Sequence, residues 1–117
     1  MLAWRRAHAL AIALHKRSRH FARAGHAHLR SQLTRAADAI STNVVEGCGA
    51  ATNKEFARFL DISIKSANET EHHLLSARDL DLFSPSEWQK FAGETIEIRK
   101  MIYAYRKKVF ESSREGI

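Results

Sequence analysis

The stretch SPSEWQKFAGETIEIRKMIYAYRKKV, residues 84–109, decides the fold class. Its apolar positions recur at alternating steps of three and four residues, which is typical of a helix packed at a shallow angle against other helices. Ser84 can cap this helix, Pro85 suits its first turn, and Glu87 completes a capping box. We expect a helix over about residues 85–111. The row consists of Trp88, Phe91, Thr95, Ile98, Ile102, Tyr105 and Val109.

Three more amphipathic helices are expected upstream, over about residues 2–22, 28–47 and 53–80. Thr52 and Glu55 give the third a capping box, and Gly47-Cys48-Gly49 ends the second. Short connections make consecutive helices antiparallel neighbours. The sequence therefore predicts a single all-α domain over residues 1–117, an antiparallel up-down-up-down four-helix bundle. Its expected core positions are Ala3, Ala7, Leu10, Leu14, Phe21, Leu29, Leu33, Ala36, Ile40, Val44, Phe56, Phe59, Leu60, Ser63, Ala67, Thr70, Leu74 and Ala77.

Composition narrows the classes of protein to which the chain can belong. No apolar run approaches the roughly 20 residues that a membrane span needs, so no membrane association is expected. The basic N-terminal segment carries apolar residues at helical spacing, which favours the first helix of the fold over a signal or transit peptide. The single cysteine, Cys48, excludes an internal disulfide and fits a reducing compartment. We expect a cytoplasmic protein.

Charge is distributed unevenly along the chain, whose formal net charge is +6. Residues 1–37 carry eight Arg and Lys and no acid, residues 38–97 are net −6, and residues 98–117 are net +4. Because the first and fourth helices of such a bundle are neighbours, we expect the two basic segments to meet on one side. A basic side is typical of nucleic-acid binders, although arginines and lysines also simply solvate helices. The candidate nucleic-acid-binding residues are Arg5, Arg6, Lys16, Arg17, Arg19, Arg23, Arg99, Lys100, Arg106, Lys107 and Lys108.

Two adjacent segments, SQLTRAADAISTNVVEGCG (residues 31–49) and KEFARFLDISIKSANETEHHLLSA (residues 54–77), carry a recognisable family pattern. They resemble bacterial four-helix bundle proteins related to those encoded in intervening sequences of large-subunit ribosomal RNA genes. Trp4 and His8 are also similar to the opening helix of that family. The matching positions are Gln32, Leu33, Arg35, Ala36, Ile40, Asn43, Glu46, Gly47, Glu55, Phe56, Arg58, Phe59, Leu60, Ile62, Ser66, Glu69 and Glu71.

The resemblance implies an assembly and a class of partner. The family is similar to the accessory variability determinants of diversity-generating retroelements, which form five-fold rings and associate with a reverse transcriptase and nucleic acid. By analogy, this chain looks like a homopentameric, basic and non-catalytic module. Ala39, Lys65 and Thr70 depart from the family pattern, and these departures bear on the geometry of the assembly.

The sequence contains no residue pattern that clearly indicates an enzyme active site. Glu69 and His72 supply one Glu-x-x-His motif, but a di-metal centre in a bundle needs two, so no metal site is expected. Glycine-rich phosphate loops and nucleophile elbows are absent, and we expect neither catalytic residues nor a cofactor. Asn43 and Glu46 should instead bond to neighbouring helices, with Arg35 and Arg58 as available partners. The family-motif residues interpreted as structural are Asn43, Glu46, Gly47, Glu69 and Glu71.

The leading hypothesis from the sequence is an oligomeric accessory protein that binds the backbone of RNA or DNA. The alternative is a protein-interaction scaffold, a ring that presents a surface to a reverse transcriptase or another protein. Ile62 and Ile64 fall outside the apolar row of their helix and are the candidate subunit contacts.

Overall fold

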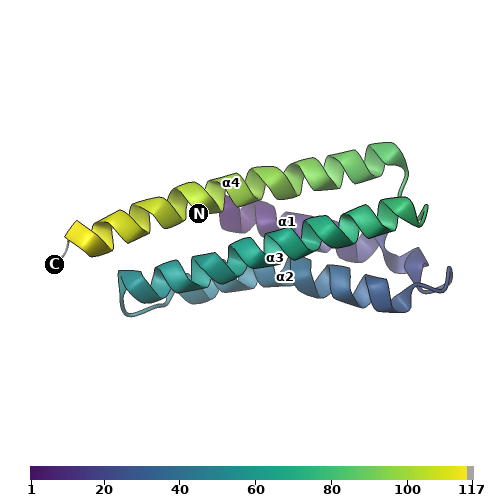
Figure 1. Cartoon of the computed structure of the whole chain (residues 1–117). Coiled ribbons are helices and arrows are strands. Elements are labelled where there is room, and N and C mark those ends of the chain that lie inside the picture. Colours follow the sequence, from purple (N-terminus) through teal and green to yellow (C-terminus); the bar gives the residue numbers. More distant parts are fainter. Residues whose placement is uncertain (116–117) are drawn as a thin grey trace.

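The computed structural model describes residues 1–115, with side chains through residue 112. Residues 116–117, the end of the predicted domain, lie outside the described part. The described chain forms four α-helices and one short 3₁₀ turn: α1 (Leu2–Arg17), η1 (Arg19–Phe21), α2 (Ala27–Cys48), α3 (Asn53–Asp79) and α4 (Pro85–Glu115). Consecutive helices run in opposite directions (Figure 1). The predicted all-α four-helix bundle is therefore confirmed.

The helices form a closed cycle in which each packs against its chain neighbours and α1 also packs against α4. The contact between α2 and α3 is the most extensive of these, and that between α1 and α4 is the smallest. One reason is length, because α1 has 16 residues and α4 has 31. Figure 1 shows α2, α3 and α4 continuing past the N-terminal end of α1. One end of the bundle, near the α2–α3 connection, is thus built from three helices. We call it the open end.

Apolar rows from all four helices meet on the bundle axis. Leu14, Leu33, Leu60, Leu74 and Ile98 are completely buried there. The core also holds bonded hydroxyl groups: the Ser63 hydroxyl donates to the Ile40 carbonyl at 2.7 Å, across from α3 to α2. Thr95, predicted in the apolar row of α4, is buried and donates to the Phe91 carbonyl.

Capping boxes begin the two longest helices as predicted. The Thr52 hydroxyl accepts the Glu55 backbone N–H at 3.1 Å. At the start of α4 both halves of the box form, because the Ser84 hydroxyl accepts the Glu87 N–H and the Glu87 carboxylate accepts the Ser84 N–H. Each bond satisfies a backbone donor that a helix otherwise leaves unpaired in its first turn.

The first helix ends earlier than its predicted limit near residue 22, so that boundary is wrong. It stops at Arg17, and the chain then tightens into the 3₁₀ turn. The turn places Phe21 in the core with no exposed surface, against Phe83 at a ring-centroid distance of 5.2 Å. Gly25 then takes φ +88°, a conformation open to glycine, before α2 begins. We call this end, where Phe21 meets Phe83, the closed end.

Two further expectations about single residues are corrected by the fold. Ile64 is 5% exposed and belongs to the core, while Ile62 is half-buried. Since α3 packs against both α2 and α4, its buried face is wider than one row, and Ile64 lies within it. Tyr105, expected in the core, is 40% exposed because it lies at the open end, where α1 does not cover α4.

Candidate nucleic-acid interface

The candidate cations of residues 1–23 divide into two sets according to whether they pair with an acid. Those that face a neighbouring helix are paired with its acids. The Arg6 guanidinium donates two hydrogen bonds to the Glu94 carboxylate of α4, with Nε–Oε2 at 3.0 Å and Nη2–Oε1 at 2.5 Å. Arg17 bonds Glu87 at the start of α4. Both pairs neutralise arginines that the sequence alone presented as candidates for binding phosphate.

The second set points outward and is not neutralised. Arg5, Lys16, Arg19 and Arg23 are exposed, and none has an ion pair with a residue of the described chain. We call these four residues the N-terminal cations. An acid-free sequence over residues 1–37 supplies no internal partner, and the acids of α2 and α4 that reach α1 already bind other groups, as Asp38 binds His15 at 2.9 Å.

The basic residues of α4 divide in the same way. Arg99 bonds Glu71 at 2.7 Å, and Lys100 lies 3.6 Å from Glu97. Lys107 and Lys108 are exposed and have no ion pair within residues 1–112. Of the eleven candidates, five are paired with acids: Arg6, Arg17, Arg99, Lys100 and Arg106.

The two basic segments meet only near the start of α1, where Arg6 Nη1 lies 3.6 Å from Met101 Sδ, so the expected gathering of their cations on one side is wrong. The helices α1 and α4 are neighbours, but they run antiparallel (Figure 1). Arg17 therefore lies beside Glu87, the beginning of α4, and Lys107 lies about 30 Å further along that helix at 1.5 Å per residue. Lys16, Arg19 and Arg23 occupy the closed end of the molecule, and Lys107 and Lys108 the open end.

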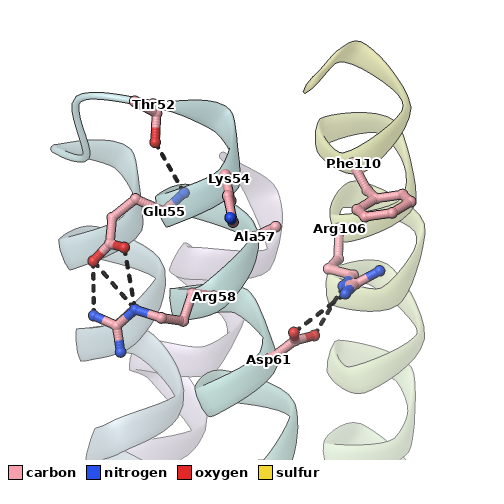
Figure 2. Close-up of a pocket in the computed structure, with 8 residues that line it drawn as sticks. All are labelled: Thr52, Lys54, Glu55, Ala57, Arg58, Asp61, Arg106 and Phe110. Atoms are coloured by element: carbon pink, nitrogen blue, oxygen red, sulfur yellow. Dashed lines mark hydrogen bonds and ion pairs between the residues drawn. The ribbon is translucent and has the colours of Figure 1, made fainter. Parts of the chain in front are cut away.

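A hollow of about 440 Å³ lies between the start of α3 and the last turns of α4 (Figure 2). Arg106 crosses it to Asp61 with two bonds, Nε–Oδ1 at 2.8 Å and Nη2–Oδ2 at 3.2 Å. The Arg106 guanidinium also lies 5.0 Å from the centre of the Phe110 ring. We call this the α3–α4 hollow. Its lining also includes Thr52, Lys54, Glu55, Ala57 and Arg58.

Local sequence explains why this hollow exists. Further along α3, Ile64 helps to form the core that Ile98 and Ile102 of α4 share. Towards the open end, α3 instead presents Asp61 and then the small Ala57, four residues apart and so on one side of the helix. An alanine methyl group leaves the space beside Phe110 unfilled, and Phe110 stays 43% exposed.

The family-motif residues have structural roles that differ in part from the expected ones. The Asn43 amide donates to the Ala39 carbonyl of its own helix at 2.8 Å, rather than to a neighbouring helix. Arg58 is bonded to Glu55, so it is not the partner of Glu46, which is exposed. The Arg58 hydrogen bond lowers the pKa of the Glu55 carboxyl.

Gly47 has a steric role that the sequence did not reveal. A Cβ atom at this position would lie 2.7 Å from Cδ1 of Phe56 and 3.1 Å from Cβ of Phe59. Glycine therefore lets α2 and α3 approach closely at the open end. Of the two remaining motif residues, Glu71 bonds Arg99, and Glu69 is exposed.

No group of three or more His, Cys, Asp and Glu side chains is placed to hold a metal ion within the described residues. His72 and His73 have adjacent rings, 5.5 Å apart, without the further ligands of such a group. Over the same residues, no helix is long and apolar enough to cross a membrane.

Lys54, Asp61 and Phe110 line the α3–α4 hollow, and sequence reasoning did not select them. Asp61 and Arg106 are 45 residues apart, so their pairing depends on the register between α3 and α4. The spacing of two residues on α3 gave one hint of this hollow. The acidic Asp61 follows the small Ala57 by four residues, about one helical turn, so the two lie on the same side of the helix.

These features define a small antiparallel helical bundle whose outward cations are left unpaired at both ends. The family model described as 23S rRNA-intervening sequence protein matches residues 1–104, and the chain belongs to that family. A protein of unknown function from the S23 ribosomal protein family of Bacteroides thetaiotaomicron VPI-5482 has the same fold. Its crystal structure superimposes with a TM-score of 0.84 at 20% identity, covering 91% of this chain and 96% of that one. Comparison with curated proteins found no match.

Proposed function

We propose that this chain is a non-catalytic, oligomeric accessory protein that binds the backbone of RNA or DNA through its unpaired cations. One observation carries the proposal: arginines of α1 that face other helices are matched by acids, whereas the four N-terminal cations are not. Phosphate contacts of this kind supply affinity without reading sequence.

Both ends of the bundle contribute to the proposed binding. Lys107 and Lys108 at the open end and Lys16, Arg19 and Arg23 at the closed end can contact phosphates well separated along one strand or duplex. A molecule 54 Å long suits an extended polyanion better than a small phosphate compound. Arg5 lies on the N-terminal part of α1, between the two ends.

Charge reversal at each end tests this proposal. We expect Arg23→Glu and Lys107→Glu each to weaken binding of a labelled RNA and of a duplex DNA alike. Each should also lower the slope of log affinity against log salt by about 1, the loss of roughly one phosphate contact. Lys65→Glu is the matched control, because Lys65 is exposed on α3 and distant in sequence from both basic segments. Equal effects of all three variants would contradict localised binding.

Exposed apolar side chains favour the alternative, a protein-interaction scaffold, and also support the oligomeric part of the proposal. Trp4 and Ile12 on α1 are 37% and 41% exposed, and Val45 on α2 is 51% exposed. Such residues are candidates for contact with another copy of the chain or with a partner protein. Light scattering should give a mass above the 13.3 kDa of one chain. A monomer mass at all concentrations would contradict the oligomer.

A further inference from the structure

Another hollow, of about 370 Å³, lies between α1 and α4 near the closed end of the bundle. It joins the last turns of α1 to the first turns of α4, and we call it the α1–α4 hollow. Three of its lining side chains are basic and one is acidic, so the lining has a net charge of +2. The lining residues are Ala13, Lys16, Arg17, Glu87, Lys90 and Phe91.

We propose that the α1–α4 hollow holds one phosphate of a polynucleotide backbone between Lys16 of α1 and Lys90 of α4. This inference rests on the proposed function and extends it to Lys90, which no role described above uses. Lys90 belongs to residues 38–97, whose net charge of −6 hid it from selection by charge along the sequence. The packing of α4 against α1 places it on the same hollow as Lys16.

Both lysines of this hollow are available to an anion. Lys16 and Lys90 are exposed, and neither has an ion pair within residues 1–112. Each ammonium group carries three hydrogen-bond donors. Two like charges that line one hollow repel each other, and an anion between them replaces this repulsion with two attractions.

The single acid of the hollow opposes an anion only weakly, because its charge is already matched. One Glu87 carboxylate oxygen accepts bonds from Arg17, and the other accepts the Ser84 backbone N–H. Arg17 uses Nε and Nη2 for Glu87, and its Nη1 has no hydrogen bond to a described residue. A guanidinium has five N–H donors, so Arg17 can donate to a phosphate while it stays bonded to Glu87.

The remaining lining suits a phosphate that carries a sugar. Ala13 is half-buried and Phe91 is buried, and both give apolar surface on which sugar carbon atoms can lie. The hollow, at about 370 Å³, is roomy enough for both groups. The next hollow along α4 is lined by Glu94 and Glu97 besides Lys90, so the positive part of this groove lies beside Lys16.

The test compares alanine variants of the full chain in binding to a labelled RNA and to a duplex DNA across a salt series. We expect Lys90→Ala to weaken binding of both probes about three- to tenfold near 0.1 M salt, the order expected for one phosphate contact. Lys16→Ala should have a similar effect. Lys65→Ala is the matched control and should change neither affinity, because Lys65 is an exposed lysine on α3 that lines neither the α1–α4 nor the α3–α4 hollow.

The variant that lacks both Lys16 and Lys90 shows whether these lysines hold the same phosphate. If they share one, removal of both should lower the slope of log affinity against log salt by only about 1. Two separate phosphates would lower the slope by about 2 and would overturn the shared site.

Failure of this inference can be distinguished from failure of the proposed function. If Lys90→Ala binds like the natural chain while Arg23→Glu and Lys107→Glu weaken binding, the α1–α4 site is overturned and backbone binding stands. If the natural chain binds neither probe at low salt, the proposed function itself fails. Inorganic phosphate or poly-glutamate that displaced the RNA as well as unlabelled RNA does, at constant ionic strength, would assign the hollow to a free anion or an acidic protein instead. Helical circular dichroism of each variant verifies that it is folded.

Discussion

At the closed end of the bundle four chain segments meet, whereas at the open end α2, α3 and α4 meet without α1. Phe21 and Phe83 fill the closed end, and the His20 ring bonds the Leu82 carbonyl at 2.8 Å. At the open end, Tyr105 and Phe110 remain partly exposed and a hollow separates α3 from α4. Packing is thus tighter at the closed end, and more aromatic surface stays exposed at the open end.

The same truncation at the two ends should show the largest contrast. We expect Phe21→Ala to lower the free energy of unfolding by about 3–5 kcal/mol, because a buried ring is lost and a cavity remains. Phe110→Ala should lower it by less, about 1–2 kcal/mol, because the Phe110 ring is already 43% exposed. Urea denaturation followed by circular dichroism measures both. Equal losses would mean that the open end is as tightly packed as the closed end.

A methyl group added at Gly47 tests how close α2 and α3 must be at the open end. We expect Gly47→Ala to destabilise the protein by about 1–3 kcal/mol, since the Phe56 ring and α3 must shift to admit a Cβ. Gly93→Ala is the control, because a Cβ there meets nothing within 4 Å and alanine favours the helix. Thermal unfolding compares the two. A Gly47→Ala variant as stable as Gly93→Ala would show that the contact gives way easily.

We expect the protein to lose stability in acid because Glu87, at the closed end, becomes protonated. The hydrogen bond from Arg17, then the capping bonds with Ser84, lower the pKa of the Glu87 carboxyl below its ordinary value of 4.5. A lowered folded-state pKa gives stability that is complete above 4.5 and is lost as the pH falls through the folded value. The urea midpoint should therefore fall between about pH 6 and pH 3, and Glu87→Gln should show a smaller fall. An identical fall in both proteins would remove Glu87 as a cause.

Features that depend on local spacing were predictable from the sequence. The buried positions Phe91, Thr95, Ile98, Ile102 and Val109 and the helix caps at Thr52 and Ser84 lie within single helices, where a few residues fix the geometry. The prediction failed where distant segments meet. Arg6 and Arg17 looked like phosphate ligands until α4 supplied Glu94 and Glu87. Ile64 was predicted to lie outside the core because a single apolar row describes too narrow a buried face for α3, which packs against both α2 and α4.

The candidate site was predictable only in part. The sequence selected Lys107 and Lys108 by charge, but it predicted that both basic segments gather on one side of the bundle. Antiparallel packing puts them at the far end of the bundle instead. The α3–α4 hollow was missed altogether, because its existence depends on Ala57 facing Phe110 across 53 residues of sequence.

Two contacts between α2 and α3, the Ser63 hydroxyl on the Ile40 carbonyl and Gly47 against Phe56, differ in how far they limit sliding of the two helices along each other. Rows of apolar residues that repeat every three or four positions fit nearly as well after a shift of one turn, about 5.4 Å. Burial alone therefore distinguishes poorly between the two alignments. The Ser63 bond does not settle the choice, because α2 presents another carbonyl one turn away. The absence of a side chain at Gly47 does: a one-turn shift would put Asn43 in its place, and a Cβ there would lie too close to the Phe56 ring. One residue without a Cβ thus helps to select a single alignment of the α2–α3 hairpin.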